Sequence, residues 1–279
     1  MSCAKVFILI CLIFLLPSLS FATIGNDSFK NNSGYFYIGG EYKPGTPHFN
    51  RFSVTNSDIK ELVSLKQEYR STIPYMTQDT TLFNLLKNNS NFTLPYDPTY
   101  TKNLLGVGGI VGYSLDNFRI ELEAFYEKFN IKVPSGYFYD NFYEYFALTP
   151  TAAKHTTNKH YCMKNTGITL SPFLVNACYD FILKKTSNIA PYLCIGVGGN
   201  FIDFLDQTNF KFAYQAKVGI SYFISSNLSF FIDGSFHGHF DNQFSDLLVD
   251  YPTDLKFTTI SAKFNINFLT SSVGIRFIS

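Results

Sequence analysis

The sequence predicts an all-β protein: an antiparallel transmembrane β-barrel of eight strands, with ten to twelve strands as the alternative. Three observations predict this class. Apolar and polar side chains alternate with a period of two in many segments. After residue 22, no stretch holds the roughly 18 consecutive apolar residues of a membrane-spanning helix. Aromatic residues make up 18% of the chain although its mean hydropathy is near neutral, which is typical of strands that show every second side chain to lipid.

The first 22 residues are predicted to be a cleaved export signal, so that residues 23–279 form a single barrel domain. Lys5 precedes an unbroken apolar run from Val6 to Leu16, and Ser20 and Ala22 supply the small residues that a signal peptidase recognises. Lys5 is the one charged side chain in this segment, so its removal lowers the formal net charge from +1 to about zero. A neutral chain without a basic patch predicts no nucleic-acid partner.

The clearest predicted strand is 119–129. Apolar side chains at Ile120, Leu122, Ala124 and Tyr126 share one face, whereas Arg119, Glu121, Glu123 and Glu127 share the other. A helix would scatter these carboxylates around its circumference. We therefore expect the apolar face to contact lipid and the charged face to line a polar lumen, with Phe125 as the one exception on the charged face.

Seven further segments show the same alternation, some of them weakly. They are 35–43, 103–114, 169–180, 189–202, 211–224, 228–240 and a last strand within 262–277. Each reaches or nearly reaches the roughly 9–11 residues that a tilted transmembrane strand needs. An even strand count returns both termini to the periplasm, and closure of the barrel removes the sheet edges.

The predicted connections alternate in length, as in outer-membrane barrels with short periplasmic turns and long extracellular loops. Short polar turns are expected at 116–117, 184–188 and 225–227, and longer loops at 44–102, 131–165, 203–210 and 241–261. Within the first long loop, 58–69 and 80–87 show helical spacing of their apolar residues. We predict short surface helices there, with extra strands as the alternative.

Seven charged or polar side chains are predicted to face the lumen: Arg119, Glu121, Glu123, Lys217, Asp233, His237 and Arg276. Asp233 and His237 also flank Ser235 on one strand face, and Ser, His and Asp together form a nucleophilic constellation. Alternate residues of a strand lie about 7 Å apart, however, which is too far for direct hydrogen bonds between them. The sequence therefore predicts a polar row, no catalytic residue and no enzyme.

Three cysteines remain after removal of the signal: Cys162, Cys178 and Cys194. In an oxidising periplasm they allow one disulfide with one thiol left over, or an intermolecular bridge. Alternatively, Cys178 and Cys194 are small lumen or packing residues. Cys162 could ligate a metal ion with His155 and His160, but the three lie in a loop without paired ligand spacing. We expect neither a metal site nor a cofactor.

Six segments in order along the chain carry a family resemblance, with poorly matching loops between them. They are 34–44 (GYFYIGGEYKP), 112–123 (GYSLDNFRIELE), 176–180 (NACYD), 191–198 (PYLCIGVG), 214–222 (YQAKVGISY) and 231–237 (FIDGSFH). In these segments the chain resembles the major surface antigen family of Anaplasma- and Ehrlichia-type bacteria. The resemblance implies a surface-exposed, immunodominant protein of a Gram-negative outer membrane, with porin activity in some members. One departure is that the chain ends two residues after Phe277, whereas outer-membrane barrels usually end on an aromatic residue.

The function predicted from these features is a surface antigen whose barrel anchors exposed loops for host interaction and antigenic display. Its partners would be outer-membrane lipid and, through the loops, host-cell surface molecules or antibodies. A porin for small hydrophilic solutes is the alternative, because the inward face is polar. Eight strands, however, give an interior that side chains just fill, whereas open porins use roughly 16–18. The sequence leaves the conductance, the solute and the oligomeric state open.

Overall fold

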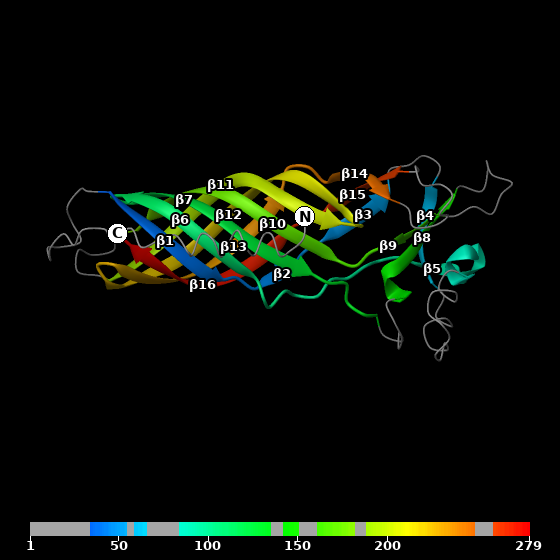
Figure 1. Ribbon diagram of the computed structural model, residues 1–279, viewed down its shortest axis with the longest axis horizontal. Helices are drawn as coiled ribbons and strands as arrows, with labels where there is room; N and C mark the ends of the chain where they lie inside the picture. Colours follow the sequence, from blue (N-terminus) through cyan, green and yellow to red (C-terminus); the bar gives the residue numbers. More distant parts are fainter. Residues whose placement is uncertain are drawn as a thin grey trace, which may run out of the picture.

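The computed structural model describes residues 34–54, 59–65, 84–134, 142–150, 161–181, 188–248 and 259–279. Long antiparallel strands form a closed barrel, and the connections at one end carry two smaller sheets (Figure 1). No helix in these ranges is long and apolar enough to cross a membrane. The predicted signal segment, 1–22, lies outside the described residues.

The barrel wall consists of eight strands, each paired with the next and the last with the first. In order around the wall these are β1 (Tyr35–Tyr42), β6 (Val107–Leu115), β7 (Phe118–Phe129), β10 (Ile168–Asp180), β11 (Ile189–Phe204), β12 (Gln207–Ser225), β13 (Leu228–His239) and β16 (Phe268–Ile278). Closure is made where β1 pairs with β16, with Gly39 opposite Arg276. The short β2 (Gly45–Pro47) follows β1 and pairs with the start of the same β16, so it lengthens the wall.

Burial alternates along most of each wall strand, as the period of two predicts. In β7, Ile120 and Leu122 are 60% and 58% exposed on the outside, whereas Glu121 and Glu123 are buried inside. Phe125 is buried inside as well, as its place in the alternation requires. The outward face carries aromatic side chains toward both rims of the apolar band, which is the girdle arrangement of outer-membrane barrels. They include Phe36, Tyr113, Phe118 and Tyr179 toward one rim and Phe173, Phe201, Phe210 and Phe212 toward the other.

At the long-loop end, which lies to the right in Figure 1, the loops fold into two sheets. One sheet has the order β14 (Gln243–Leu248), β15 (Thr259–Asn265), β3 (Asn50–Val54). The other has the order β5 (Phe92–Pro95), β4 (Ile59–Leu65), β8 (Tyr145–Pro150), β9 (Tyr161–Lys164). Two 3-10 turns, η2 (Asn89–Asn91) and η3 (Phe142–Glu144), belong to the same region. We call these two sheets the cap.

The eight-strand prediction is confirmed, and the alternative of ten to twelve barrel strands is wrong, because the additional strands pair within the cap. The helix predicted over 58–69 is also wrong: 59–65 is strand β4, paired on both sides by β5 and β8. Of the predicted helix at 80–87, residues 84–87 form one helical turn. The rest of 58–87 outside 59–65 lies outside the described residues. Two predicted wall strands begin later than expected. Residues 103–106 of the predicted strand 103–114 precede β6, and residues 262–265 of the predicted segment 262–277 belong to β15 of the cap.

The predicted long loop at 203–210 does not exist. Strands β11 and β12 run through it with Asp203 opposite Thr208, and a turn at Leu205 and Asp206 joins them. Both turn residues have positive φ, 51° and 57°, which gives the backbone twist that a two-residue hairpin needs. The short turns at Asp116–Asn117 and at 225–227 are confirmed. The turn predicted at 184–188 lies almost wholly outside the described residues.

Candidate functional site

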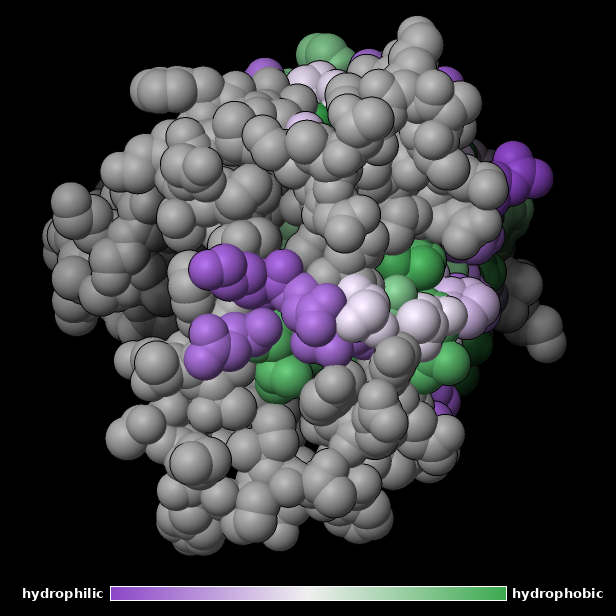
Figure 2. All heavy atoms as spheres, turned by 90° about the vertical axis from the view of Figure 1, so that its right-hand side faces the viewer, coloured by the Kyte–Doolittle hydropathy of each residue, from purple (hydrophilic) through white to green (hydrophobic). Residues whose placement is uncertain are grey.

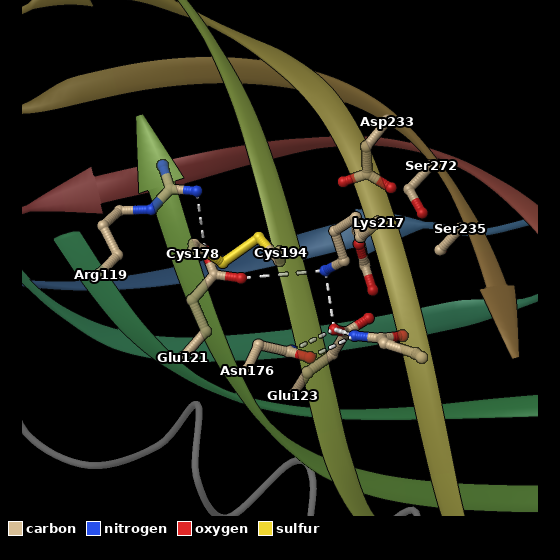
Figure 3. Close-up of polar contacts among 12 residues, drawn as sticks. Arg119, Glu121, Glu123, Asn176, Cys178, Cys194, Lys217, Asp233, Ser235 and Ser272 are labelled. Carbon is tan, nitrogen blue, oxygen red and sulfur yellow. Dashed lines mark hydrogen bonds and ion pairs between the residues drawn. A yellow bond between two sulfur atoms is a disulfide. The ribbon is translucent and has the colours of Figure 1, made fainter. Parts of the chain in front are cut away.

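The lumen is the place where the chemistry-bearing side chains of the barrel meet. Arg119, Glu121, Glu123, Lys217, Asp233, His237 and Arg276 are each no more than 5% exposed and lie inside the barrel. They come from β7, β12, β13 and β16, and each points inward because it occupies the inner register of its strand. Figure 3 shows the central part of this group around the two glutamates of β7.

Glu123 accepts hydrogen bonds from four buried side chains. Lys43 Nζ lies 2.7 Å from its Oε1, and Lys217 Nζ lies 2.7 Å from its Oε2. Asn176 Nδ2 and Gln215 Nε2 donate to the same Oε2 at 2.8 and 2.7 Å. Two ammonium groups and two amides therefore satisfy a carboxylate that burial alone would strongly disfavour.

Glu121, two residues before Glu123 on the same inner face of β7, forms a second centre. Its Oε1 lies 3.3 Å from the Arg276 guanidinium and 3.5 Å from that of Arg119, and accepts a 2.8 Å hydrogen bond from the Tyr37 hydroxyl. Lys217 lies 3.8 Å from its other oxygen and so joins the two centres. Arg119 also pairs with Asp180 at 3.1 Å.

These contacts cross the lumen. Strand β12, which carries Lys217, is three places from β7 around a wall of eight, so the Lys217–Glu123 pair joins nearly opposite walls. Arg276 of β16 likewise reaches Tyr192 of β11, and the Tyr192 hydroxyl donates to Asp233 of β13 at 2.7 Å. An eight-stranded barrel has an interior just wide enough for side chains to fill, and here they fill it with a connected polar network.

Aromatic side chains continue the filling toward the cap. The His237 ring stacks on the Phe268 ring, with 4.5 Å between the ring centroids, and its centroid lies 5.0 Å from that of the Phe125 ring. Above them, rings of the barrel and of the cap form one apolar cluster. Its buried rings are Phe125, Phe129, Phe146, Phe204, Phe244, Phe264 and Phe268. Partly buried rings, including Phe49, Phe52 and Tyr96, pack against them. The barrel and the cap therefore share one core.

The row of Asp233, Ser235 and His237 does not form a nucleophilic relay. Asp233 accepts from Tyr192, whereas Ser235 and His237 both hydrogen-bond the Thr270 hydroxyl, at 2.8 and 3.0 Å. The three side chains thus bond to residues of other wall strands, β11 and β16, as the spacing along one strand predicts.

Cys178 and Cys194 face the lumen and form a disulfide between β10 and β11, so the alternative that they are unbonded small residues is wrong. Within the described part of the chain, Glu121 with these two sulfurs is the one group whose spacing could suit a metal ion. Because the sulfurs are bonded to each other, they offer no thiolate ligands. Cys162 is buried in the cap, where its Sγ lies 3.6 Å from the Leu86 carbonyl oxygen. His155 and His160 lie outside the described residues.

The predicted set of lumen residues lacks several members of the network, among them Tyr37, Glu41, Lys43 and Tyr192. Glu41 and Lys43 pair with each other at 3.2 Å and continue the inner register of β1 beyond Gly39. Both lie within the predicted strand 35–43, on the face of Gly39, so assigning the faces of that strand would predict their inward position. The two tyrosines gave no such signal, because aromatic residues occupy both faces of this wall.

The closed wall, the apolar outer band and the filled lumen define the class of protein: a small outer-membrane β-barrel. The model of the family described as surface antigen matches residues 28–278. The chain is 33% identical over 219 residues to major surface antigen 4 of Anaplasma marginale, covering 77% of this chain and 72% of that protein. The protein belongs to this surface antigen family.

Two solved structures resemble the chain at low sequence identity. The outer membrane protein OprG from Pseudomonas aeruginosa matches with a TM-score of 0.49 and 13% identity, covering 91% of this chain and 99% of that one. Neisserial surface protein A matches with a TM-score of 0.39 and 12% identity, covering 88% and 96%. The fold assignment stands on the strand pairing described above.

Proposed function

We propose that the barrel is a closed anchor that displays the cap outside the cell for contact with host molecules and antibodies. The single observation that carries the proposal is the continuous filling from the Glu121 and Glu123 centres up to the shared aromatic cluster. A barrel filled in this way holds a rigid platform, and rigid platforms place function on their loops. Membership of the surface antigen family supports the same role.

The orientation follows from the asymmetry of the connections. The C-terminus lies at the short-turn end (Figure 1), and outer-membrane barrels keep short turns in the periplasm and long loops outside. The cap would then face the exterior. Among its described residues, hydrophilic side chains gather near the middle of this face beside smaller apolar areas (Figure 2).

Surface display is tested by epitope tags at two positions. A tag inserted between Lys66 and Thr81, within the first long loop, should be labelled by antibody on intact cells. A matched tag in the Ser226–Asn227 turn at the opposite end should be labelled only after the outer membrane is opened. Equal labelling of the two tags on intact cells would contradict the orientation.

Host contact is tested by replacing 44–102 with the corresponding loop of another family member. We expect the variant to assemble, because that segment lies outside all the wall strands except for the β2 extension, and to lose antibody recognition or host-cell binding of the original protein. If neither changes, the display role of this loop is wrong.

Conductance separates the anchor from a porin for small hydrophilic solutes. Refolded protein, shown to be folded by its heat-dependent gel mobility, should be silent in planar lipid bilayers, because inward side chains from opposite walls are in contact. Stable channels whose conductance changes in Lys217→Gln would overturn the anchor proposal and favour the porin.

A further inference from the structure

The disulfide between Cys178 and Cys194 lies inside the barrel. The two residues are directly opposite each other on β10 and β11, and both occupy the inner register. Cys178 is 2% and Cys194 is 1% exposed. Figure 3 shows the bridge beside Glu121, among side chains that reach in from the other walls.

Large side chains enclose the bridge on several sides. Tyr37, Tyr192 and Phe231 are buried in the same cluster as the two cysteines, and they come from β1, β11 and β13. The guanidinium of Arg119 lies over the Tyr192 ring at 4.7 Å, and that of Arg276 lies over the Phe231 ring at 4.0 Å. Thiol–disulfide exchange requires an attacking thiolate to reach a sulfur atom, and in the closed barrel these groups occupy the approach.

We propose that Cys178 and Cys194 are oxidised before the barrel closes, while the exported chain has not yet assembled its wall, and that this chain is a substrate of a periplasmic dithiol oxidase. One cysteine thiolate attacks the disulfide of the oxidase and forms a mixed disulfide, and the second thiolate then displaces the oxidase. The two thiols lose two electrons and two protons, and the disulfide of the oxidase is reduced to a dithiol. Barrel assembly then follows the oxidation.

Cys162 competes with Cys194 for the disulfide to Cys178. It lies as far before Cys178 in the sequence as Cys194 lies after it, a separation of 16 residues. The entropy of closing the loop is therefore the same for the wrong pair and the native pair. What distinguishes them is strand pairing: β10 and β11 are adjacent and place Cys178 opposite Cys194, whereas Cys162 lies in β9 of the cap. Early formation of the β10–β11 hairpin would select the native bridge.

Labelling in vitro tests whether the bridge is enclosed. The Cys162→Ala variant of residues 23–279 is prepared reduced and oxidised in urea, and both forms are transferred into detergent micelles. In the folded oxidised barrel, reduction by dithiothreitol and trapping by a maleimide should be at least about a hundredfold slower than in urea, because exchange must wait for opening of the wall. A folded reduced barrel should resist oxidation by glutathione disulfide to the same degree. Reaction within a few-fold of the rate in urea, for either folded form, would overturn the proposal.

Expression in two hosts tests the order of events. The two hosts are a Gram-negative strain with its periplasmic dithiol oxidase and the same strain without it. Without the oxidase, the yield of folded barrel carrying the bridge should fall several-fold, and it should recover when cystine is added to the medium. Cys162→Ala should keep this dependence. The double variant Cys178→Ala, Cys194→Ala carries no bridge, so its total yield of folded barrel should be the same with and without the oxidase. Equal yields of bridged wild-type barrel in the two hosts would overturn the proposal. The labelling experiment does not need the double variant. It therefore shows whether the cysteines can react in the closed barrel even where that variant fails to fold.

Discussion

Glu123 shows how a single buried carboxylate organises the lumen. Its four donors come from Lys43 beyond β1, Asn176 of β10, and Gln215 and Lys217 of β12. A buried ion pair adds little net stability compared with well-packed apolar side chains, but removal of one partner leaves the other charge unpaired. The network therefore fixes which side chains meet, and its members are sensitive to substitution one at a time.

Replacement of Glu123 by Gln tests this sensitivity. The variant keeps the shape but leaves both lysine ammonium groups without their common carboxylate, so we expect the free energy of unfolding to fall by about 3–5 kcal/mol. The measurement is urea unfolding in lipid vesicles, followed by heat-dependent gel mobility. Asp97→Asn is the control, because Asp97 is an exposed carboxylate of the cap region and its loss should change stability by less than about 0.5 kcal/mol. Indistinguishable midpoints for the two variants would contradict the account of the network.

The cap is an element with its own strand pairing and a core shared with the barrel. The Phe146 ring of β8 is fully buried and stacks on Tyr96 at 4.2 Å, with Phe52 of β3 at 5.8 Å. None of these three rings belongs to a wall strand. Loss of this packing should therefore loosen the cap and leave the hydrogen-bonded wall intact.

Phe146→Ala is the corresponding prediction. Truncation of a fully buried phenylalanine costs about 3–5 kcal/mol, and here the cost falls on the local stability of the cap. We expect faster proteolytic cleavage of the cap in folded protein, with unchanged heat-dependent mobility of the protease-resistant barrel. Thr93→Ala, at an exposed position of β5 in the same sheet, should leave the cleavage rate unchanged. A simultaneous loss of the barrel would show that the wall depends on the cap.

At the scale of the whole molecule, the apolar band on the outside of the barrel predicts where the wall lies in the membrane. The outward side chains of β12 from Phe210 to Ile224 are all aliphatic or aromatic. Val218, which is 63% exposed, therefore lies near the middle of the band, and Ile224 lies at the short-turn rim. The energetic cost of a charge on this face depends on its depth, because only the middle of the bilayer lacks water.

Two arginine variants on the same face of the same strand measure this depth. Val218→Arg should destabilise the folded barrel in vesicles by roughly 2–4 kcal/mol, and Ile224→Arg by about 0–1 kcal/mol. Reversible unfolding of the two variants and the wild type in phospholipid vesicles provides the comparison. Equal costs, or a larger cost for Ile224→Arg, would mean that the membrane lies elsewhere along the wall.

The alternation of side chains determined the wall. In β7, β10, β12 and β13 a period of two decides which residues face lipid and which face inward, and that decision is local to each strand. Each side chain of a wall strand points either to lipid or into the lumen. The inward placement of residues such as Glu121 and Lys217 therefore follows from the same pattern.

The tertiary structure decided everything that depends on contacts between distant segments. The β11–β12 turn at Leu205 and Asp206 lacks the glycine or asparagine that usually marks two positive φ angles, so it looked like part of a longer loop. The apolar spacing of 58–69 predicts a helix, but 59–65 forms strand β4 because it pairs with β5 and β8, which lie far away in the sequence. The pairing of Cys178 with Cys194 rather than Cys162 was equally hidden, since equal spacing gives equal loop entropy and only strand register distinguishes the two pairs. Local periodicity encodes which face a residue occupies, whereas its partner across the lumen is set only when the barrel closes.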